Sequence, residues 1–268
     1  MFNYVISLKS SIERRQHIEK EFSKQNIPYS FFDAFQPNEE NEHIIQQYVP
    51  SLNKTDLTIG EKGCFMSHVL LWQKCVDENL PFIAIFEDDI ILSPVAHQFL
   101  GQYDWLKERF DFSQYFILRL ETHSMQSIYR STKIQPFQQR RFHQLLFLHW
   151  GTAGYIISQF AARKLLTLFQ TPDISIYPID VILFESLLKE EQYPVYQLDP
   201  AILIQDFILN KENCKLTSSL APERERESKK GEQRKKARKS LWRSISKEIG
   251  RFRIRVKRRL QGYVIKFY

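Results

Sequence analysis

The stretch Phe82–Pro94 places five consecutive apolar residues directly before three carboxylates, Glu87, Asp88 and Asp89. The apolar run is short and rich in β-forming residues, so it predicts a buried strand rather than a helix. Negative charges this close to a core are costly to bury unless a cation neutralises them. By itself, the triplet is equally typical of a polar strand end or of an acidic helix start before Pro94.

The spacing within this triplet predicts that its side chains point in different directions. On an extended backbone, Glu87 and Asp89 point to one side of the strand and Asp88 points to the other. Carboxylate oxygens suit Mn²⁺ or Mg²⁺, and such ions keep several waters and bind substrate phosphates. We therefore expect Glu87 and Asp89 to bind Mn²⁺ or Mg²⁺, and Asp88 to contact another part of the ligand.

The chain begins with the pattern of a β-α-β unit, in which a strand over Asn3–Leu8, a helix over Ile12–Gln25 and a strand over Tyr29–Ala34 follow one another. Such a unit favours a parallel sheet with a right-handed crossover. In these sheets, ligands bind beyond the carboxyl ends of the strands. The polar residues that this arrangement places at the binding edge are Ser7, Lys9, Arg14 and Asp33. A solvated helix face is the alternative for Arg14.

Residues 58–78 predict a long helix whose first turns contain Gly60 and Gly63. Glycine at these positions lets the backbone approach a ligand closely. The polar side chains of the same turns, which we expect to face that ligand, are Glu61, Ser67 and His68. For His68, a buried histidine that is hydrogen-bonded within the core is the alternative.

The remainder of the chain continues to alternate helices and strands. The expected elements are a helix from Pro94 to Arg109, a strand over Tyr115–Glu121, a hairpin within 128–148, a helix over Gln159–Phe169 and a strand over Val195–Leu198. Gly154 lies in a small-residue strand, where the backbone can pass close to a sugar or nucleotide. Asp180 falls in the first turn of a helix that opens at Pro178, where serving the helix dipole is the alternative.

Charge divides the chain into two parts. Residues 222–268 contain 18 Lys and Arg against 5 acids, whereas residues 1–221 contain 20 against 26. We expect a mildly acidic α/β domain over 1–221 and a basic linker and tail over 222–268. The acidity of the larger part argues against a nucleic-acid groove across it.

Cysteine usage and hydropathy indicate where the protein resides. The three cysteines have no paired spacing, and Cys64 and Cys75 lie about 16 Å apart on one expected helix, too far to form a disulfide. No apolar run approaches the length of a membrane span, and the first strand follows no secretory signal. We therefore expect a protein of the cytoplasm.

Common nucleotide and zinc motifs are absent from this sequence, because it contains no Gly-x-Gly-x-x-Gly, no Walker-type loop and no Cys/His zinc spacing. The acidic strand end of the α/β domain is then the remaining candidate for a ligand-binding site. A metal at that position, bridging a diphosphate, would stabilise the charge that develops on a departing nucleoside diphosphate. Displacing that group from a sugar also requires a base for the incoming hydroxyl, and the chain offers several carboxylates.

An ordered set of segments resembles glycosyltransferase family 25, which includes bacterial lipopolysaccharide and lipooligosaccharide galactosyltransferases and collagen galactosyltransferases. The matching segments are Val5–Leu8, Glu13–Arg15, Phe32–Ala34, Leu57–His68, Ile83–Asp89, Gly151–Tyr155 and Pro178–Asp180, and they span most of residues 1–205. The resemblance implies a GT-A-like fold, which is a Rossmann-type, mostly parallel sheet flanked by helices. It also implies a UDP-sugar donor, with galactose as the expected hexose, a divalent metal and inversion at the anomeric carbon.

The resemblance also implies roles for individual residues. Asp180 is the expected catalytic base, and Glu121, which closes a strand, is its competitor. Glu87 and Asp89 are the expected metal ligands. The expected donor-binding residues are Ser7, Arg14, Asp33, Glu61, Ser67, His68, Asp88 and Gly154.

The basic tail predicts a membrane partner. From Leu241 to Val264, apolar residues recur every three or four positions among Lys and Arg, which is typical of an amphipathic helix on an anionic membrane. Such a helix would hold the enzyme at the inner face of the cytoplasmic membrane, near a lipid-linked oligosaccharide acceptor. A solvated tail and a helix packed on the acidic domain are alternatives. The competing function is a non-catalytic scaffold whose tail binds anionic membrane or nucleic acid.

Overall fold

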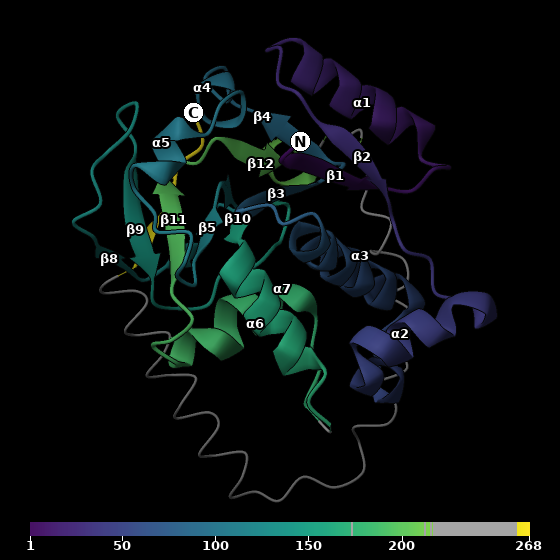
Figure 1. The fold of residues 1–268 in the computed structure, drawn as a ribbon. Coiled ribbons are helices and arrows are strands. Elements are labelled where there is room, and N and C mark those ends of the chain that lie inside the picture. The colour runs from purple at the N-terminus through teal and green to yellow at the C-terminus, as the bar shows by residue number, and fades with distance from the viewer. Residues whose placement is uncertain (173, 212, 215, 217–261) are drawn as a thin grey trace, which may run out of the picture.

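The computed structural model describes residues 1–172, 174–211, 213–214, 216 and 262–268. An eight-stranded sheet forms the centre of this part of the molecule, in the order β2-β1-β3-β10-β5-β11-β9-β8 (Figure 1). Its strands in chain order are β1 (Asn3–Ser7), β2 (Ser30–Asp33), β3 (Phe82–Glu87), β5 (Ile117–Arg119), β8 (Tyr129–Ser131), β9 (Arg141–Leu145), β10 (Gly154–Ser158) and β11 (Val195–Asp199). Two small sheets accompany it, namely β4 (Ile90–Leu92), β12 (Leu203–Gln205) and β6 (Glu121–Thr122), and the pair β7 (Gln126–Ser127) and β13 (Tyr263–Val264).

The sheet is mixed, whereas the sequence predicted a mostly parallel one. β1 is parallel to β2 and β3, which confirms the predicted β-α-β start, and β5 is parallel to β11. β10, however, runs antiparallel between β3 and β5, and β9 runs antiparallel to β8 and β11. The physical reason lies in the connection, since residues 121–153 contain no helix that would carry the chain back to the opposite edge.

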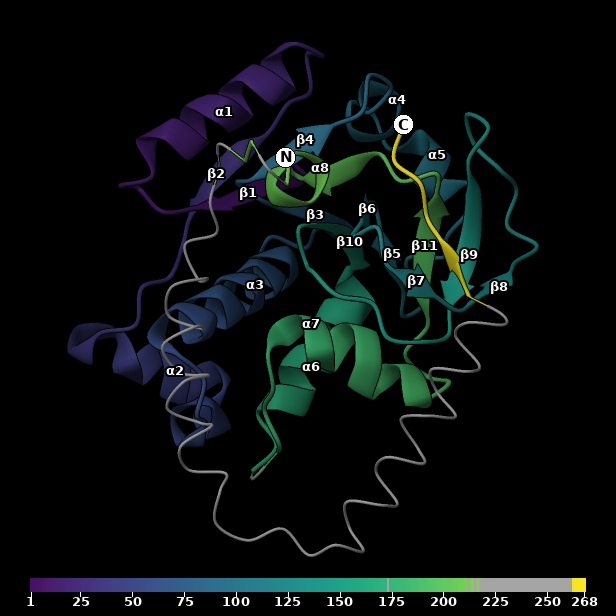
Figure 2. The ribbon, with the colours of Figure 1, turned by 180° about the vertical axis from the view of Figure 1, so that it is seen from behind.

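Helices cover both faces of the sheet. They are α1 (Ile12–Ser23), α2 (Glu42–Tyr48), α3 (Ile59–Asp77), α4 (His97–Leu100), α5 (Asp104–Lys107), α6 (Gln159–Phe169), α7 (Ile179–Val181) and α8 (Asp206–Leu209). A π-helical turn at Ile182–Ser186 and a 3₁₀ turn at Leu187–Lys189 extend α7, and further 3₁₀ turns span Glu39–Asn41 and Pro50–Lys54. In Figures 1 and 2, α3 and α6 lie against one face, and α1, α4 and α5 lie against the other.

Two expected elements are divided in the structure. The single helix predicted from Pro94 to Arg109 is the pair α4 and α5. The first ends at Leu100, and the chain then turns Tyr103 inward to donate a hydrogen bond to buried Asn3. The predicted strand Tyr115–Glu121 contributes β5 to the main sheet and β6 to a small one. In both cases, tertiary contacts override a continuous local pattern.

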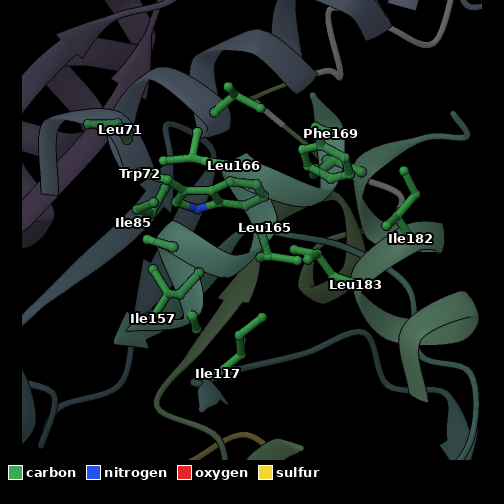
Figure 3. Packing of buried hydrophobic residues seen from close by; sticks show 14 of the residues in the cluster. Leu71, Trp72, Ile85, Ile117, Ile157, Leu165, Leu166, Phe169, Ile182 and Leu183 are labelled. Atoms are coloured by element: carbon green, nitrogen blue, oxygen red, sulfur yellow. The ribbon is translucent and has the colours of Figure 1, made fainter. Parts of the chain in front are cut away.

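Side chains of the central strands alternate between the two faces of the sheet, and a separate hydrophobic core lies against each face. In β1, Tyr4 and Ile6 join the core beneath α3 and α6, while Val5 joins the core beneath α1, α4 and α5. Figure 3 shows the first of these cores, where Trp72 of α3 and Leu165 of α6 pack together over β-strand residues such as Ile157. The sheet is therefore buried on both faces.

Local signals at the start of α3 fix where this helix begins. Thr58 accepts a hydrogen bond from the amide of Glu61, and the Glu61 carboxylate accepts one from the amide of Thr58, which forms a capping box. Gly63 allows a close approach, because a Cβ there would lie 2.6 Å from the carbonyl oxygen of Phe35. The helix thus packs tightly on the segment that follows β2.

The C-terminal residues 262–268 return to the domain. Val264, which the sequence placed on an amphipathic helix, lies in strand β13 and pairs with Gln126. Ile265 is buried, and its carbonyl accepts a hydrogen bond from Thr122. The rest of the expected basic linker and tail, residues 222–261, lies outside the described residues. Among those described, no helix is long and apolar enough to span a membrane.

Gly154, in β10, provides a test of the packing between the main sheet and β12 of a small sheet. A Cβ at this position would lie 2.5 Å from Leu203 Cδ2, and Leu203 is fully buried. We predict that Gly154→Ala lowers the free energy of unfolding by about 1–3 kcal/mol, as overpacking does. Denaturant unfolding measures this cost, which should shrink in a Leu203→Ala background. An equal cost in both backgrounds would contradict the packing role.

Candidate active site

Two cavities lie side by side at the carboxyl ends of β1 and β3. The first, called here the Asp180 cavity, has a volume of about 430 Å³, and the second, the Ser7 cavity, has a volume of about 370 Å³. Both are lined by Arg14, Cys64 and Glu87, so they share a wall at the end of β3. This position agrees with the expectation that a ligand binds at the carboxyl edge of the strands.

The acidic triplet forms a turn rather than an extended strand. Glu87 ends β3, and Asp88 and Asp89 make the turn that leads into β4. The expectation of strict alternation along an extended backbone is therefore wrong, because β4 folds back at once to pair with β12. The turn still separates the three carboxylates, since Glu87 lines both cavities, Asp88 lines the Ser7 cavity and Asp89 lines the Asp180 cavity.

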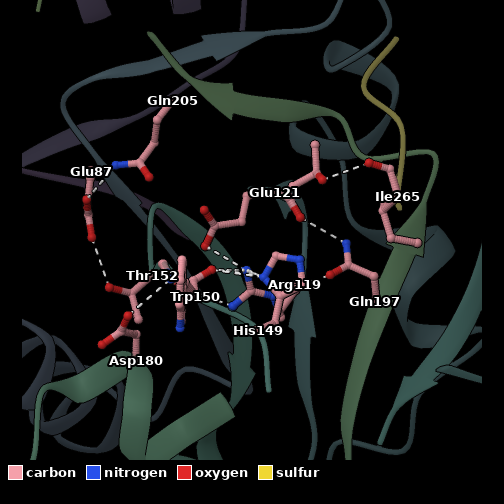
Figure 4. Close-up of polar contacts among 12 residues, drawn as sticks. Glu87, Arg119, Glu121, His149, Trp150, Thr152, Asp180, Gln197, Gln205 and Ile265 are labelled. Carbon is pink, nitrogen blue, oxygen red and sulfur yellow. Dashed lines mark hydrogen bonds and ion pairs between the residues drawn. The ribbon is translucent and has the colours of Figure 1, made fainter. Parts of the chain in front are cut away.

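Arg14 and Gln205 hold the triplet in place. The Arg14 guanidinium forms ion pairs with Asp88 and with Asp89, the latter at 3.2 Å. The amide of Gln205, at the end of β12, donates to Glu87 at 3.3 Å, as Figure 4 shows. The same amide donates to Asp89 at 3.1 Å. Thr152 donates its hydroxyl proton to the other oxygen of Glu87 at 2.9 Å. Four separate segments of the chain therefore meet at these carboxylates.

The electrostatics of this cluster favour an added cation. Burial, together with the charges of Asp89 and Glu121, raises the pKa of Glu87 to about 8. Burial also raises the pKa of Asp89, although Arg14 opposes the shift. Because Arg14 alone does not offset the clustered negative charge, the site fits a divalent ion that Glu87 and Asp89 could hold through hard oxygen ligands.

Asp180 and Glu121, the two candidates for the base, lie in different surroundings. Asp180 lines the cavity named after it, and its carboxylate accepts hydrogen bonds from the amide of Gly151 at 3.2 Å and from that of Val181 at 2.9 Å. Glu121 is fully buried, lies 3.3 Å from buried Arg119 and is not among the residues that line either cavity. Burial raises the pKa of Glu121 to about 7, with Arg119 opposing the shift.

Gly151 connects these two carboxylates. Its φ of +85° is a left-handed conformation that favours glycine, and a Cβ would lie 2.9 Å from an Oε2 of Glu121. The same residue donates its amide proton to Asp180. The backbone at Gly151 therefore packs against the buried ion pair on one side and positions the cavity carboxylate on the other.

The predicted donor-binding residues divide into three groups. Ser7, Arg14, Ser67, His68 and Asp88 line the Ser7 cavity. Glu61 lines the Asp180 cavity. Asp33 and Gly154 line neither.

Asp33 and Gly154 have local explanations for their positions. The Asp33 side chain is 50% exposed and pairs with Arg15 at 2.5 Å and Lys9 at 3.1 Å, and these cations lower its pKa. Gly154 packs beneath Leu203. The hydroxyl of Ser67 is likewise engaged, since it accepts from the amide of Phe35 and donates to the carbonyl of Gly63.

Several site residues were missed by the sequence reasoning. The sequence pattern assigned no role to Trp150, Thr152 or Gln205, and Cys64 was considered only as a cysteine on the expected helix. Gln205 carries the one available signal, because it directly follows a run of apolar residues at a strand end, as Glu87 does. The pairing of β12 with β4 that brings Gln205 to Glu87 is a long-range contact that no local pattern encodes.

A buried relay fixes the orientation of His68. The indole N–H of Trp72 donates to the Tyr155 hydroxyl at 3.0 Å, and that hydroxyl lies 2.9 Å from Nδ1 of His68. Because indole is only a donor, the hydroxyl proton is available for Nδ1, and we predict that the ring proton of His68 is on Nε2. Burial lowers the pKa of His68 to about 3, so the ring is neutral.

The tautomer of His68 decides between two roles. Nε2 is buried and has no hydrogen-bond partner among the described residues, and His68 lines the Ser7 cavity. Ligand atoms of Cys64, His68 and Glu87 lie within 4.8 Å of one another, as in a metal site. A ring nitrogen that carries a proton does not ligate a metal, so the relay favours His68 as a hydrogen-bond donor to a ligand in the Ser7 cavity.

Comparison with known proteins assigns this chain to a family. Residues 1–183 match Glycosyltransferase family 25 (LPS biosynthesis protein). The chain belongs to this family. The predicted resemblance is thus confirmed, and the family 25 match includes the acidic turn and the Gly151–Asp180 contact.

Two relatives of this family 25 chain are proteins of lipooligosaccharide biosynthesis or related glycosyltransferases. It is 42% identical to Lipooligosaccharide biosynthesis protein lic2B of Haemophilus influenzae over 225 residues, which covers 84% of this chain and 83% of the relative. It is 44% identical to Lacto-N-neotetraose biosynthesis glycosyltransferase LgtE of Neisseria meningitidis serogroup B over 232 residues, which covers 85% of this chain and 83% of the relative. The chain is therefore a glycosyltransferase of family 25.

Tyr155→Phe tests the relay directly. Removing the hydroxyl leaves Nδ1 of His68 without its donor, so we predict that the protonated nitrogen changes from Nε2 alone to a mixture of both nitrogens. Nuclear magnetic resonance of ¹⁵N-histidine-labelled protein reports the tautomer. Tyr115→Phe is the matched control, because the Tyr115 hydroxyl is also buried but lies outside the relay. A wild-type His68 protonated on Nδ1 would contradict the assignment.

Proposed function

We propose that this family 25 enzyme transfers a hexose from a UDP-sugar to a hydroxyl of a lipooligosaccharide or lipopolysaccharide acceptor, with inversion and with the help of a divalent metal. Galactose is the hexose we expect. The observation that carries the proposal is that Glu87, Asp89 and Asp180 line one cavity, while the adjoining Ser7 cavity holds most of the expected donor-binding residues. The binding edge of the mixed sheet supports the assignment of a GT-A-type fold.

Glu87 and Asp89 would hold Mn²⁺ or Mg²⁺, which when bound would neutralise charge on the diphosphate of the donor. Arg14 reaches the wall that both cavities share and adds a second positive charge there. His68 would donate its Nε2 proton to an oxygen of the donor. Gln205 and Thr152 keep the two acidic ligands in fixed orientations through the hydrogen bonds that they donate.

Asp180 is the proposed base. The acceptor oxygen forms its bond to the anomeric carbon as the bond from that carbon to UDP breaks on the opposite face. The acceptor proton passes to Asp180, and UDP leaves with the bonding electrons. The amides of Gly151 and Val181 donate hydrogen bonds to the Asp180 carboxylate and fix its direction. Glu121 suits this role less well, because it is buried beside Arg119 outside the cavity.

The relatives support the choice of acceptor, since their names refer to lipooligosaccharide and lacto-N-neotetraose biosynthesis. A lipid-linked acceptor and the basic composition of residues 222–268 together support a location at the anionic inner face of the cytoplasmic membrane. Co-sedimentation of the full chain with anionic and neutral liposomes tests this part of the proposal. Equal binding to both lipids would contradict it.

A transfer assay tests the proposed activity. The full chain is incubated with Mn²⁺, an oligosaccharide acceptor and, in turn, UDP-galactose, UDP-glucose and UDP-N-acetylhexosamines, and products are identified by mass spectrometry. We expect transfer with UDP-galactose and loss of transfer when the metal is chelated. A chain that neither transfers nor hydrolyses any donor would support the alternative of a non-catalytic scaffold.

The identity of the base can be decided with two conservative variants. Asp180→Asn should lower turnover by about 10²- to 10⁴-fold while keeping UDP affinity, because it removes only proton transfer. Glu121→Gln should mainly lower the melting temperature, because it leaves buried Arg119 without its charged partner. Steady-state kinetics at saturating donor, with calorimetric UDP binding, measure both effects. The reverse pattern would assign the base to Glu121.

A further inference from the structure

Trp150 is a large aromatic residue that remains half exposed at the active site. Its side chain is 49% exposed, and it lines the Asp180 cavity. The proposed chemistry uses carboxylates and amides of that cavity and gives no role to the indole, which presents a large apolar surface to it. An exposed aromatic surface of this kind at a polar cavity is typical of a ligand-binding wall.

The backbone fixes Trp150 relative to the proposed base. The Trp150 carbonyl accepts a hydrogen bond from the guanidinium of buried Arg119 at 2.9 Å. The next residue, Gly151, donates its amide proton to Asp180 at 3.2 Å. The segment that carries the indole is thus tied to a buried cation on one side and to the cavity carboxylate on the other, as Figure 4 shows.

The indole also belongs to a small aromatic group, which consists of Trp150, His123 and Phe207. The His123 ring meets the indole edge-on, with centroids 5.7 Å apart, and lies 5.8 Å from the ring of Phe207. All three line the Asp180 cavity, and none lines the Ser7 cavity. Burial lowers the pKa of His123, so its imidazole is neutral and can exchange hydrogen bonds with hydroxyls.

We propose that Trp150 and His123 form the acceptor subsite, in which the pyranose ring that receives the new bond stacks its C–H face on the indole. This inference rests on the proposed function and deepens it. A sugar ring combines an apolar face with hydroxyls at its edge, so an indole beside a neutral imidazole and a carboxylate matches it in chemistry. The stacked ring would direct one hydroxyl toward Asp180, while the donor occupies the Ser7 cavity.

Kinetics with separate variation of the two substrates test the subsite. The probes are UDP-galactose with Mn²⁺ as donor and the methyl glycosides of glucose, galactose and N-acetylglucosamine as acceptors. Trp150→Ala should raise the KM of the extended glycoside at least about tenfold, which corresponds to 1.4 kcal/mol, with no comparable rise in the KM of the donor. Trp150→Phe should restore most of the acceptor affinity, and Trp150→Leu should not, because the flat aromatic face is the feature required.

Phe160→Ala is the matched control, because Phe160 is a similarly exposed aromatic residue on α6 that lines neither cavity. It should leave both KM values unchanged. If Trp150→Ala fails to fold, Trp150→Leu decides the question. An unchanged acceptor KM in a folded Trp150 variant, or equal rises in both KM values, would overturn the subsite alone. A wild-type chain that extends no glycoside would overturn the subsite together with the proposed function.

Discussion

The burial of negative charge at the end of β3 is the constraint on which the arrangement of this molecule depends. Glu87 and Asp89 sit at the end of a strand that is buried on both faces, where an unpaired carboxylate is costly. The chain supplies Arg14 from α1, Gln205 from β12 and Thr152 from the loop before β10. These contributions reduce the cost, but burial still raises the pKa values of Glu87 and Asp89, which is consistent with the cation proposed for this site.

The division of space around this cluster suits a reaction between two substrates. The Asp180 and Ser7 cavities share Arg14, Cys64 and Glu87. Ligands in the two cavities would therefore meet beside the positive charge of Arg14. A leaving diphosphate requires that charge, and an incoming hydroxyl requires a base on the opposite side. Asp180, the proposed base, accepts a hydrogen bond from Gly151, and Gly151 in turn packs closely against the buried carboxylate of Glu121.

The sequence predicted those features that depend on local patterns. The β-α-β start, the long helix over residues 58–78 and the helix Gln159–Phe169 follow from local sequence patterns, and the structure has them. The reversed direction of β10 and the contact of Gln205 with Glu87 depend on how distant strands pair, which no local pattern encodes. For the same reason, the sequence could name Asp180 and Glu121 as candidates for the base but could not tell which one lines a cavity.

The position of the cation is the most direct measure of whether buried charge organises this site. Crystals of the full chain grown with Mn²⁺ and UDP would be measured at the manganese absorption edge, where anomalous scattering locates the ion. We predict a manganese peak within coordination distance, about 2.2 Å, of a carboxylate oxygen of Glu87 or Asp89 and next to the diphosphate. A peak coordinated by Cys64 and His68, or UDP bound with no manganese at these carboxylates, would contradict this account.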